Sequence, residues 1–402
     1  MTYDFTRRID RTGLDALALD AIHLPAGLGP DAPQPGSDFI PMWIADMNFE
    51  TLPKISQAIA ARAQHPLFGY FVPSKDYYQK IAQWHLDRHQ VEGIKNAHIS
   101  YHNGVLGGVL TAMRVLASRG DKVLLHSPTY VGFTQVLANN GYDMIHSALY
   151  QDQAGVWRMD YEDMEAKIIE HKIHVAIFCS PHNPTGRVWQ EWEIKQAMDI
   201  FEKHQVFVIS DEIWSDLVLQ GQKHIPSQTI SDYGRQHTLA LYAPSKTFNL
   251  AGLVGAYSIS YNQWLTDRMA KEASLTHYNS MNVLSMHAQN AAYSKEGQAW
   301  LEDLLVVIEA NIDLAVDFIN QKLDGVTVTK PQGTYMIFID CSNYLRQKGL
   351  SMSELIKRGW DYGVGWQSGE AFHAPDHIRL NLALPTSQLQ EALNRLAQYV
   401  FV

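Results

Sequence analysis

The chain has 402 residues, 46% hydrophobic and 18% charged, which is long enough for a large hydrophobic core and a second, smaller domain. Its 32 Lys and Arg against 42 Asp and Glu give a formal net charge of −10, which argues against nucleic acid or an anionic membrane as a partner. The two cysteines have no CxxC spacing and no apolar run is long enough to span a bilayer, so we expect a cytoplasmic protein with a small-molecule partner and no metal.

The first 51 residues are expected to form an N-terminal arm that contributes to the smaller domain and to a lid over the active site. The stretch "PAGLGPDAPQPGSD" is too rich in Pro and Gly for regular structure. Regular patterning starts near Leu52, where short apolar runs begin to alternate with amphipathic stretches.

Six of these apolar runs are predicted to be strands: "KVLLH", "DMIHSAL", "HVAIFCS", "VFVIS", "TLALYA" and "GAYSIS". Strands that are apolar throughout and separated by helical segments are typical of a mostly parallel sheet covered on both faces. The fold class is therefore α/β, with a three-layer α/β/α large domain over residues 52–290.

The last part of the chain, residues 291–402, is predicted to be a small α+β domain. A long helical stretch covers about residues 297–323, and two strands follow, "YMIFID" and "HIRLNLAL", with helices between and after them.

Polar side chains follow four of the predicted strands. Tyr130 lies in "SPTY" after the first run, Asn183 in "SPHNPTG", Asp211 in "SDEIW", and Ser245 and Lys246 directly after "TLALYA". Because ligands of an open parallel sheet bind beyond the carboxyl ends of its strands, these side chains are candidates for one site.

A phosphate site is indicated by "HNGVLGGVL", in which Gly104, Gly107 and Gly108 open a helical pattern whose N–H groups and dipole favour an anion. Each feature alone has a simpler explanation: glycines allow close packing, NPTG forms turns, Asp caps helices and Lys is usually solvated. Together they meet the needs of pyridoxal 5'-phosphate (PLP): a lysine for the Schiff base, a carboxylate for the ring nitrogen, an aromatic face and phosphate donors.

The segments "SPHNPTG", "SDEIW" and "APSKTFNLAGL", with 28 positions from Asn183 to Asp211 and 35 from there to Lys246, resemble the fold-type-I PLP enzymes of the aspartate aminotransferase superfamily. The stretches "PMWIADMNFETLPKISQAI" and "HPLFGY" are similar to the branch that contains the cystathionine β-lyase type C–S lyases. The resemblance extends over nearly the whole chain.

This resemblance implies a role for each of the candidate residues. Lys246 would form the Schiff base with PLP and act as the catalytic base, Asp211 would pair with the ring nitrogen, Asn183 would bond to the 3-oxygen, and Tyr130 would stack on the ring. Trp214 stands where many relatives have a Tyr or His near the 3-oxygen, so polar help from that position is expected to be lost.

The phosphate would be held by the backbone at Val105 and Leu106 and by the hydroxyl of Ser245. Tyr70 would reach the phosphate from the neighbouring subunit, which implies a homodimer with shared active sites.

The substrate carboxylate would be bound by Arg379 in "HIRLNLALP", a planar bidentate donor, with Asn183 and the backbone around Ala45 completing the site. The branch favours a C–S β-lyase that converts sulfur amino acids to pyruvate, ammonia and a thiol. An aminotransferase is the alternative, because both reactions begin with the same proton abstraction. A cofactor-sensing regulator is less favoured, because the chain shows no helix-turn-helix signal and no basic patch.

Overall fold

A computed structural model describes residues 2–23, 38–276 and 279–402. Most of the Pro- and Gly-rich stretch expected to be irregular, residues 25–37, lies outside the described part of the chain. The chain divides into two compact units: a small unit of Met1–Glu50, Pro184–Gly186 and Asp303–Val402, and a large unit of Thr51–Asn183 and Arg187–Glu302. The domain limits expected from the sequence, 51/52 and 290/291, stay a proposal.

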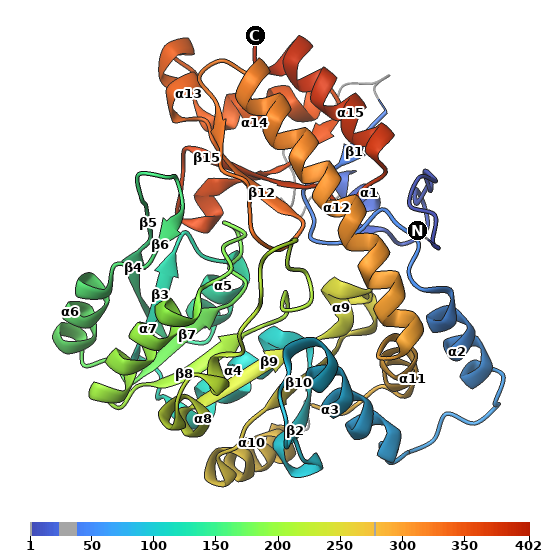
Figure 1. Cartoon of the computed structure of the whole chain (residues 1–402), viewed down its shortest axis with the longest axis vertical. Helices are drawn as coiled ribbons and strands as arrows, with labels where there is room; N and C mark the ends of the chain where they lie inside the picture. The colour runs from blue at the N-terminus through green and yellow to red at the C-terminus, as the bar shows by residue number, and fades with distance from the viewer. Residues whose placement is uncertain (1, 24–37, 277–278) are drawn as a thin grey trace. The chain divides into compact units, whose positions relative to one another are not determined.

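The large unit is built on a seven-stranded sheet with the order β2-β10-β9-β8-β7-β3-β4 (Figure 1). In that order the strands are Ile99–Asn103, Gly255–Ile259, Thr238–Tyr242, Phe207–Asp211, Val175–Cys179, Lys122–Ser127 and Asp143–Ala148. The strands β9, β8, β7, β3 and β4 are parallel to one another, and β10 is antiparallel to both β9 and β2. All six predicted strands are therefore present, whereas β2 was not predicted.

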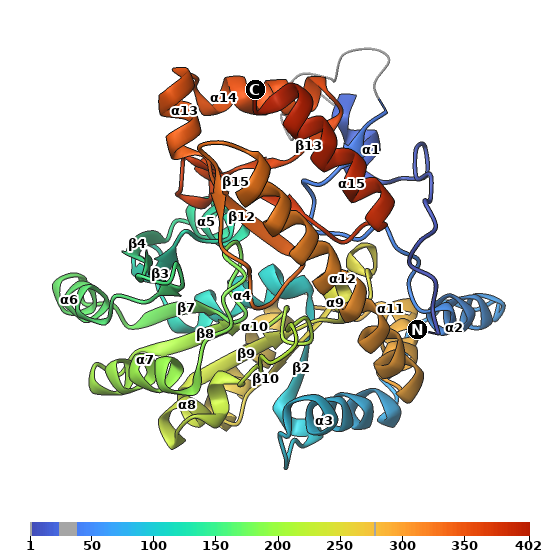
Figure 2. The same ribbon diagram turned by 45° about the horizontal axis from the view of Figure 1, so that its top comes forward.

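Helices cover both faces of this sheet (Figures 1 and 2). In β7, Val175 and Ile177 face a core formed with α4, α5 and α10, whereas Ala176 and Phe178 face a core formed with α6, α7 and α8. Helices α4, α5 and α10 are Gly104–Leu116, Val131–Asn139 and Gln263–Thr276. Helices α6, α7 and α8 are Tyr161–His171, Glu191–Lys203 and Asp232–His237. The predicted three-layer α/β/α arrangement is confirmed.

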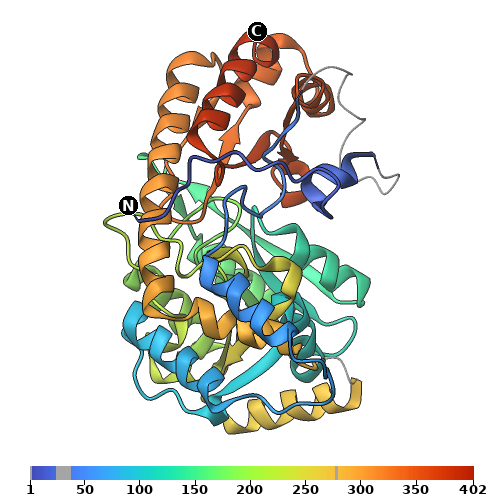
Figure 3. The same ribbon diagram turned by 90° about the vertical axis from the view of Figure 1, so that its right-hand side faces the viewer.

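The remaining helices of the large unit are α2 (Pro53–Ala63), α3 (Lys75–His89), the short α9 (Pro244–Thr247) and α11 (Val283–Ala292). Local signals explain where they begin: Pro53 and Pro244 occupy the first turns of α2 and α9, and the Ser74 hydroxyl accepts a hydrogen bond from Tyr77 N at the start of α3. Helices α2 and α11 pack side by side (Figure 3).

The small unit contains a four-stranded antiparallel sheet with the order β11-β12-β15-β14, formed by Thr327–Val328, Met336–Asp340, His377–Asn381 and Gln367–Ser368. Its helices include α13 (Ser342–Lys348), α14 (Met352–Asp361) and α15 (Thr386–Arg395), and α12 (Lys295–Lys322) begins in the large unit and ends in the small one. The short strand β1 (Ile40–Pro41) pairs in parallel with β13 (Val364–Gly365). The α+β character predicted for this part is confirmed.

No helix among the described residues combines the length and the apolar character that crossing a bilayer requires.

Candidate active site

Three of the predicted site residues meet at one edge of the large sheet. Asp211 ends β8 and pairs in register with Cys179 at the end of β7 and with Leu241 in β9. Asn183 follows Cys179 closely, and its backbone hydrogen-bonds to the Cys179 thiol. Lys246 follows β9 and acts electrostatically on the Asp211 carboxyl group. The topology of a parallel sheet therefore gathers an amide, a carboxylate and an amine.

Asp211 is buried, with 4% of its surface exposed. Burial raises the pKa of its carboxyl group to about 7, although the backbone N–H of Ile213, 3.0 Å from Oδ1, and the charge of Lys246 both act to lower it. A carboxylate that is this costly to ionise favours a cationic partner, and a protonated pyridine nitrogen would be one. The setting fits the predicted role of Asp211.

Lys246 lies in the four-residue helix α9, and both it and Ser245 are half-buried. The next residue, Thr247, is fully buried, and its hydroxyl donates a 2.9 Å hydrogen bond to Asp216 Oδ2. The Lys246 Nζ lies over the ring of Trp214, 5.7 Å from its centroid. The lysine is therefore anchored at its backbone and faced by an aromatic ring at its tip.

Sequence reasoning missed a buried network behind the site, which begins at Glu212. The Glu212 carboxylate accepts hydrogen bonds from the Tyr242 hydroxyl at 2.7 Å and the Ser227 N–H at 3.0 Å, and His224 Nε2 lies 2.8 Å away. Burial acts to raise the pKa of Glu212, but these partners lower it to about 2. The pKa of Asp211 is therefore raised and the pKa of the neighbouring Glu212 is lowered.

Asp216 is the second carboxylate of this network. Trp84 Nε1 donates to it at 3.1 Å, Thr247 donates at 2.9 Å, and His89 Nε2 lies 3.5 Å away. Burial acts to raise the pKa of Asp216, but hydrogen bonds and the charges of His89 and Arg88 lower it to about 2. Trp84 and Thr247 are 132 and 31 residues away in the chain, so only the folded structure shows this contact.

The predicted phosphate site is the start of α4. Gly104, its first residue, has φ +74°, a conformation that favours glycine, and the following N–H groups of Val105 and Leu106 belong to the first turn, where no helical partner exists. Gly108 has a packing role instead, because a Cβ there would come within 2.5 Å of Leu241 Cδ2. The start of α4 is suited to binding a phosphate, and Gly108 allows the helix to pack closely against Leu241 of β9.

Tyr130 is the residue before α5 and lies close to the start of α4. A Cβ at Gly132 would come within 2.4 Å of Tyr130 Cε1 and 2.9 Å of Leu106 Cδ1, so the tyrosine ring and Leu106 both border the bare glycine backbone. Tyr130 also makes an edge contact with Phe133, at 5.4 Å between centroids. Sequence reasoning also missed Gly132, which allows Tyr130 to approach the predicted phosphate site.

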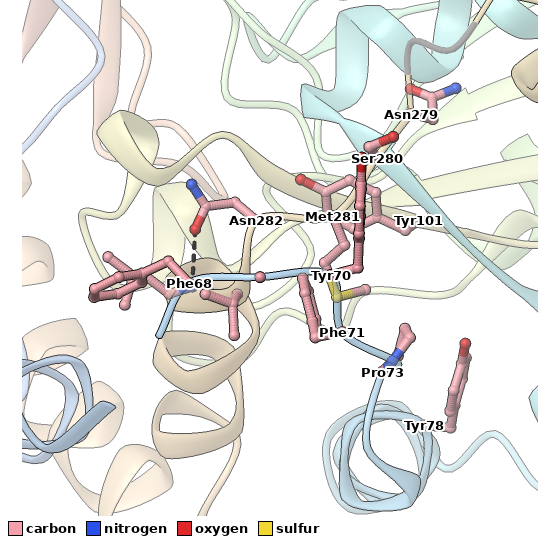
Figure 4. A pocket seen from close by; sticks show the side chains of 13 residues that line it. Phe68, Tyr70, Phe71, Pro73, Tyr78, Tyr101, Asn279, Ser280, Met281 and Asn282 are labelled. Carbon is pink, nitrogen blue, oxygen red and sulfur yellow. Dashed lines mark hydrogen bonds between the residues drawn. The ribbon is translucent and has the colours of Figure 1, made fainter. Parts of the chain in front are cut away.

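Tyr70 lies between α2 and α3, and its side chain is fully exposed. It lines a pocket of about 830 Å³ together with Tyr101 and the segment 279–284 (Figure 4). Asn279 in this wall accepts a 3.1 Å hydrogen bond from the backbone N–H of Asn103, which directly precedes α4. The Tyr70 side chain is therefore accessible at the surface of the large unit.

Within the small unit, the structure brings Arg379 and Ala45 together. Arg379 is 2% exposed, and its guanidinium donates to the Trp43 carbonyl at 3.3 Å and to the side-chain oxygen of Gln367. The Tyr335 hydroxyl donates to the Ala45 carbonyl at 3.0 Å. Burial raises the pKa of that tyrosine and the charge of Arg379 opposes the rise, so the two side chains are neighbours. A buried cation bonded to neutral oxygens is well suited to a carboxylate ligand.

The fold and the gathered residues define an enzyme built to hold PLP, and comparison with known proteins names the family. A model described as "Aminotransferase class I and II" matches residues 37–396, so the chain belongs to the aminotransferase class I and II family.

Among curated proteins, the chain is 31% identical to cystathionine beta-lyase PatB of Bacillus subtilis (strain 168), with 98% of each chain covered. Among solved structures, it is 34% identical to a PLP-bound putative aminotransferase from Clostridium difficile 630, with a TM-score of 0.90 and 98% and 99% of the two chains covered. Cystalysin from Treponema denticola, which contains PLP, is 29% identical, with a TM-score of 0.90 and 99% and 98% coverage. The predicted family and the predicted type I fold are confirmed.

Proposed function

We propose that this protein is a PLP-dependent C–S β-lyase, which cleaves the Cβ–S bond of a sulfur amino acid and yields pyruvate, ammonia and a thiol. The observation that carries the proposal is the buried Asp211 beside Lys246, in a chain similar over 98% of its length to a cystathionine beta-lyase. The predicted cofactor, PLP, is confirmed by the family and by the relatives whose structures contain it.

When bound, PLP supplies an electron sink that makes the Cα–H bond of an amino acid acidic. Lys246 takes the Cα proton as general base. Asp211 supplies the negative charge that keeps the ring nitrogen protonated, because its own ionisation is unfavourable without a cationic neighbour. Asn183 would hold the 3-oxygen, and Tyr130 would cover one face of the ring.

Two further groups of residues bind the phosphate of the cofactor and the carboxylate of the substrate. The N–H groups of Val105 and Leu106 and the hydroxyl of Ser245 bind the phosphate. On the substrate, Arg379 binds the α-carboxylate through its planar guanidinium, with Asn183 and the backbone at Ala45 completing the contact.

The fate of the substrate after the proton leaves decides between lyase and aminotransferase. A thiolate departs readily from Cβ, whereas an aminotransferase must deliver the proton elsewhere and release a keto acid. The similarity to cystathionine beta-lyase PatB and to cystalysin supports the lyase, and the 34% identity to a putative aminotransferase supports the second candidate. A cofactor-sensing regulator ranks below both.

We also propose a homodimer in which Tyr70 of one copy reaches the phosphate bound by the other. The segment around Tyr70 exposes apolar side chains, with Leu67 68%, Phe68 58% and Val72 85% exposed, as is typical of a surface that another chain covers. The expected location, the cytosol, is a proposal that cell fractionation would test.

The deciding experiment supplies L-cystathionine to the PLP-loaded enzyme without any keto acid. Continued release of pyruvate, ammonia and homocysteine in equal amounts over many turnovers supports the lyase. A single half-turnover that resumes only when a keto acid is added would identify an aminotransferase. Lys246→Ala is the control, because it removes the general base from both reactions.

A further inference from the structure

We infer that the indole ring of Trp214 is a binding face for the positively charged form of the Lys246 side chain, which makes Trp214 a positioning residue for the base of the reaction. The inference rests on the proposed function, in which Lys246 becomes a cation when it takes the Cα proton. The Lys246 Nζ lies over the ring at 5.7 Å from its centroid, within the roughly 6 Å at which an aromatic face attracts a cation.

The ring of Trp214 is held rigidly in place. Only 2% of Trp214 is exposed, and it lies in a tight turn in which Ser215 N donates to the Glu212 carbonyl at 3.0 Å and Leu217 N donates to the Trp214 carbonyl at 2.9 Å. The side chains two positions before and after it, Glu212 and Asp216, are both fixed by buried hydrogen bonds. The ring therefore has little freedom to move away from the lysine.

The backbone that carries Lys246 is tied to the same turn. The hydroxyl of Thr247 donates to Asp216 Oδ2 at 2.9 Å, and both residues are buried. Asp216 is two residues from Trp214, and Thr247 is next to Lys246, so one side-chain hydrogen bond fixes the base of the lysine relative to the ring. The two contacts hold the lysine at its backbone and at its tip.

Among the described residues that act on Lys246 is the carboxyl group of Asp211. Helix α9 packs on β10 and on the turn Ala251–Leu253, which carries no titratable side chain. On β10 the titratable side chain is Tyr257, whose hydroxyl lies 2.9 Å from His85 Nε2 and 3.1 Å from the Tyr293 hydroxyl. Asp211 acts on Lys246 from β8. Arg88 and His89, on α3, act on Asp216.

An aromatic face suits this task better than a second carboxylate would. A carboxylate beside Lys246 would bind the ammonium as a tight ion pair and compete for its proton, whereas the indole face attracts the charge and takes no proton. The cation can then stay near Cα and pass its proton on. Trp214 thus offers Lys246 an electrostatic contact at a position where polar help near the 3-oxygen is expected to be lost.

The test compares the PLP-loaded wild type with Trp214→Leu by following the visible absorption band of the bound cofactor against pH, which reports the protonation of the Lys246 nitrogen. Loss of the aromatic face should lower the midpoint of this titration by about 0.4 to 1.5 pH units, because a cation–π contact contributes about 0.5 kcal/mol when exposed and about 2 kcal/mol when desolvated. Trp214→Phe should lower it by less. In the cofactor-free, full-length Trp214→Leu variant, an amine reagent should label Lys246 at a lower pH than in the wild type.

Trp189→Leu is the matched control, since Trp189 is equally buried and faces another cation, Arg187, at 5.4 Å. It should leave the midpoint within about 0.2 pH units of wild type. If Trp214→Leu does not fold, Trp214→Phe carries the test.

An unchanged or raised midpoint in the Trp214 variants would overturn the inference, because packing alone would alter thermal stability and not this titration. Borohydride reduction and peptide mapping keep the two proposals apart. A label away from Lys246 refutes the proposed function, whereas a label on Lys246 with an unchanged midpoint refutes only the role of Trp214.

Discussion

Replacing Asp211 by Asn should make the cofactor-free protein more stable and the loaded enzyme much less active. Burial raises the pKa of Asp211 from 3.8 to about 7. The folded state therefore holds this proton more tightly than the unfolded chain does, and the free energy of unfolding falls as pH rises from 3.8 to about 7. A rise of about 3 pH units, at 1.36 kcal/mol each, corresponds to about 4 kcal/mol.

The assay is urea unfolding of the cofactor-free wild type and Asp211→Asn at pH 4 and pH 8, at one protein concentration. An amide stays neutral, so the stability of the variant relative to wild type should increase by up to about 4 kcal/mol between the two pH values. Asp199→Asn is the control, because Asp199 is an exposed partner of Lys195 and should change stability by about 1 kcal/mol or less.

With PLP bound, the same variant should lose about two to three and a half decades of activity, because breaking a buried charge pair costs about 3–5 kcal/mol. Equal stability differences at pH 4 and pH 8 would refute the burial argument. Activity within tenfold of wild type would show that Asp211 has only a structural role.

Three further predictions concern the other site residues. Lys246→Ala should abolish turnover yet keep some PLP bound, and borohydride should label Lys246 in the wild type; a label on another lysine would contradict the assignment. If Tyr70 crosses between subunits, mixing inactive Tyr70→Phe and Lys246→Ala chains should restore some activity, measured after subunit exchange has been verified. Arg379→Ala should reduce kcat/KM for amino acids by an amount that corresponds to about 2–5 kcal/mol of lost binding in the transition state. Substrate analogues without the carboxylate should be insensitive to that change, and equal sensitivity would exclude the carboxylate contact.

Strands β3, β7, β8 and β9 could be predicted because they are mostly buried apolar runs, which leave little choice of structure. Strand β2, "ISYHN", escaped because its apolar pattern is broken by polar side chains. His102 is nonetheless buried, with Nε2 2.9 Å from the Ser258 hydroxyl on β10. The buried position of His102 in β2 is explained only by its partner on β10.

The same distinction applies to the candidate site. Lys246, Asp211 and Asn183 could be predicted because each lies at or soon after the end of a recognisable strand, and strand ends meet at one edge of a parallel sheet. Asp216 could not be predicted, because its hydrogen-bond donors, Trp84 and Thr247, lie far away in the sequence. Gly132 could not be predicted either, because its role depends on the Tyr130 ring and the Leu106 side chain that lie against it.

The pairing of β1 with β13 has a consequence for how the protein is made. Ile40 in β1 pairs with Val364 in β13, which is 324 positions later in the chain. At about 5–20 residues per second, a ribosome needs about 15 to 65 s to supply that partner. Meanwhile the stretch that includes Ile40, Met42 and Trp43, all buried in the finished protein, has no complete place to fold. The newly made N-terminal segment therefore lacks its partner strand until synthesis is almost complete.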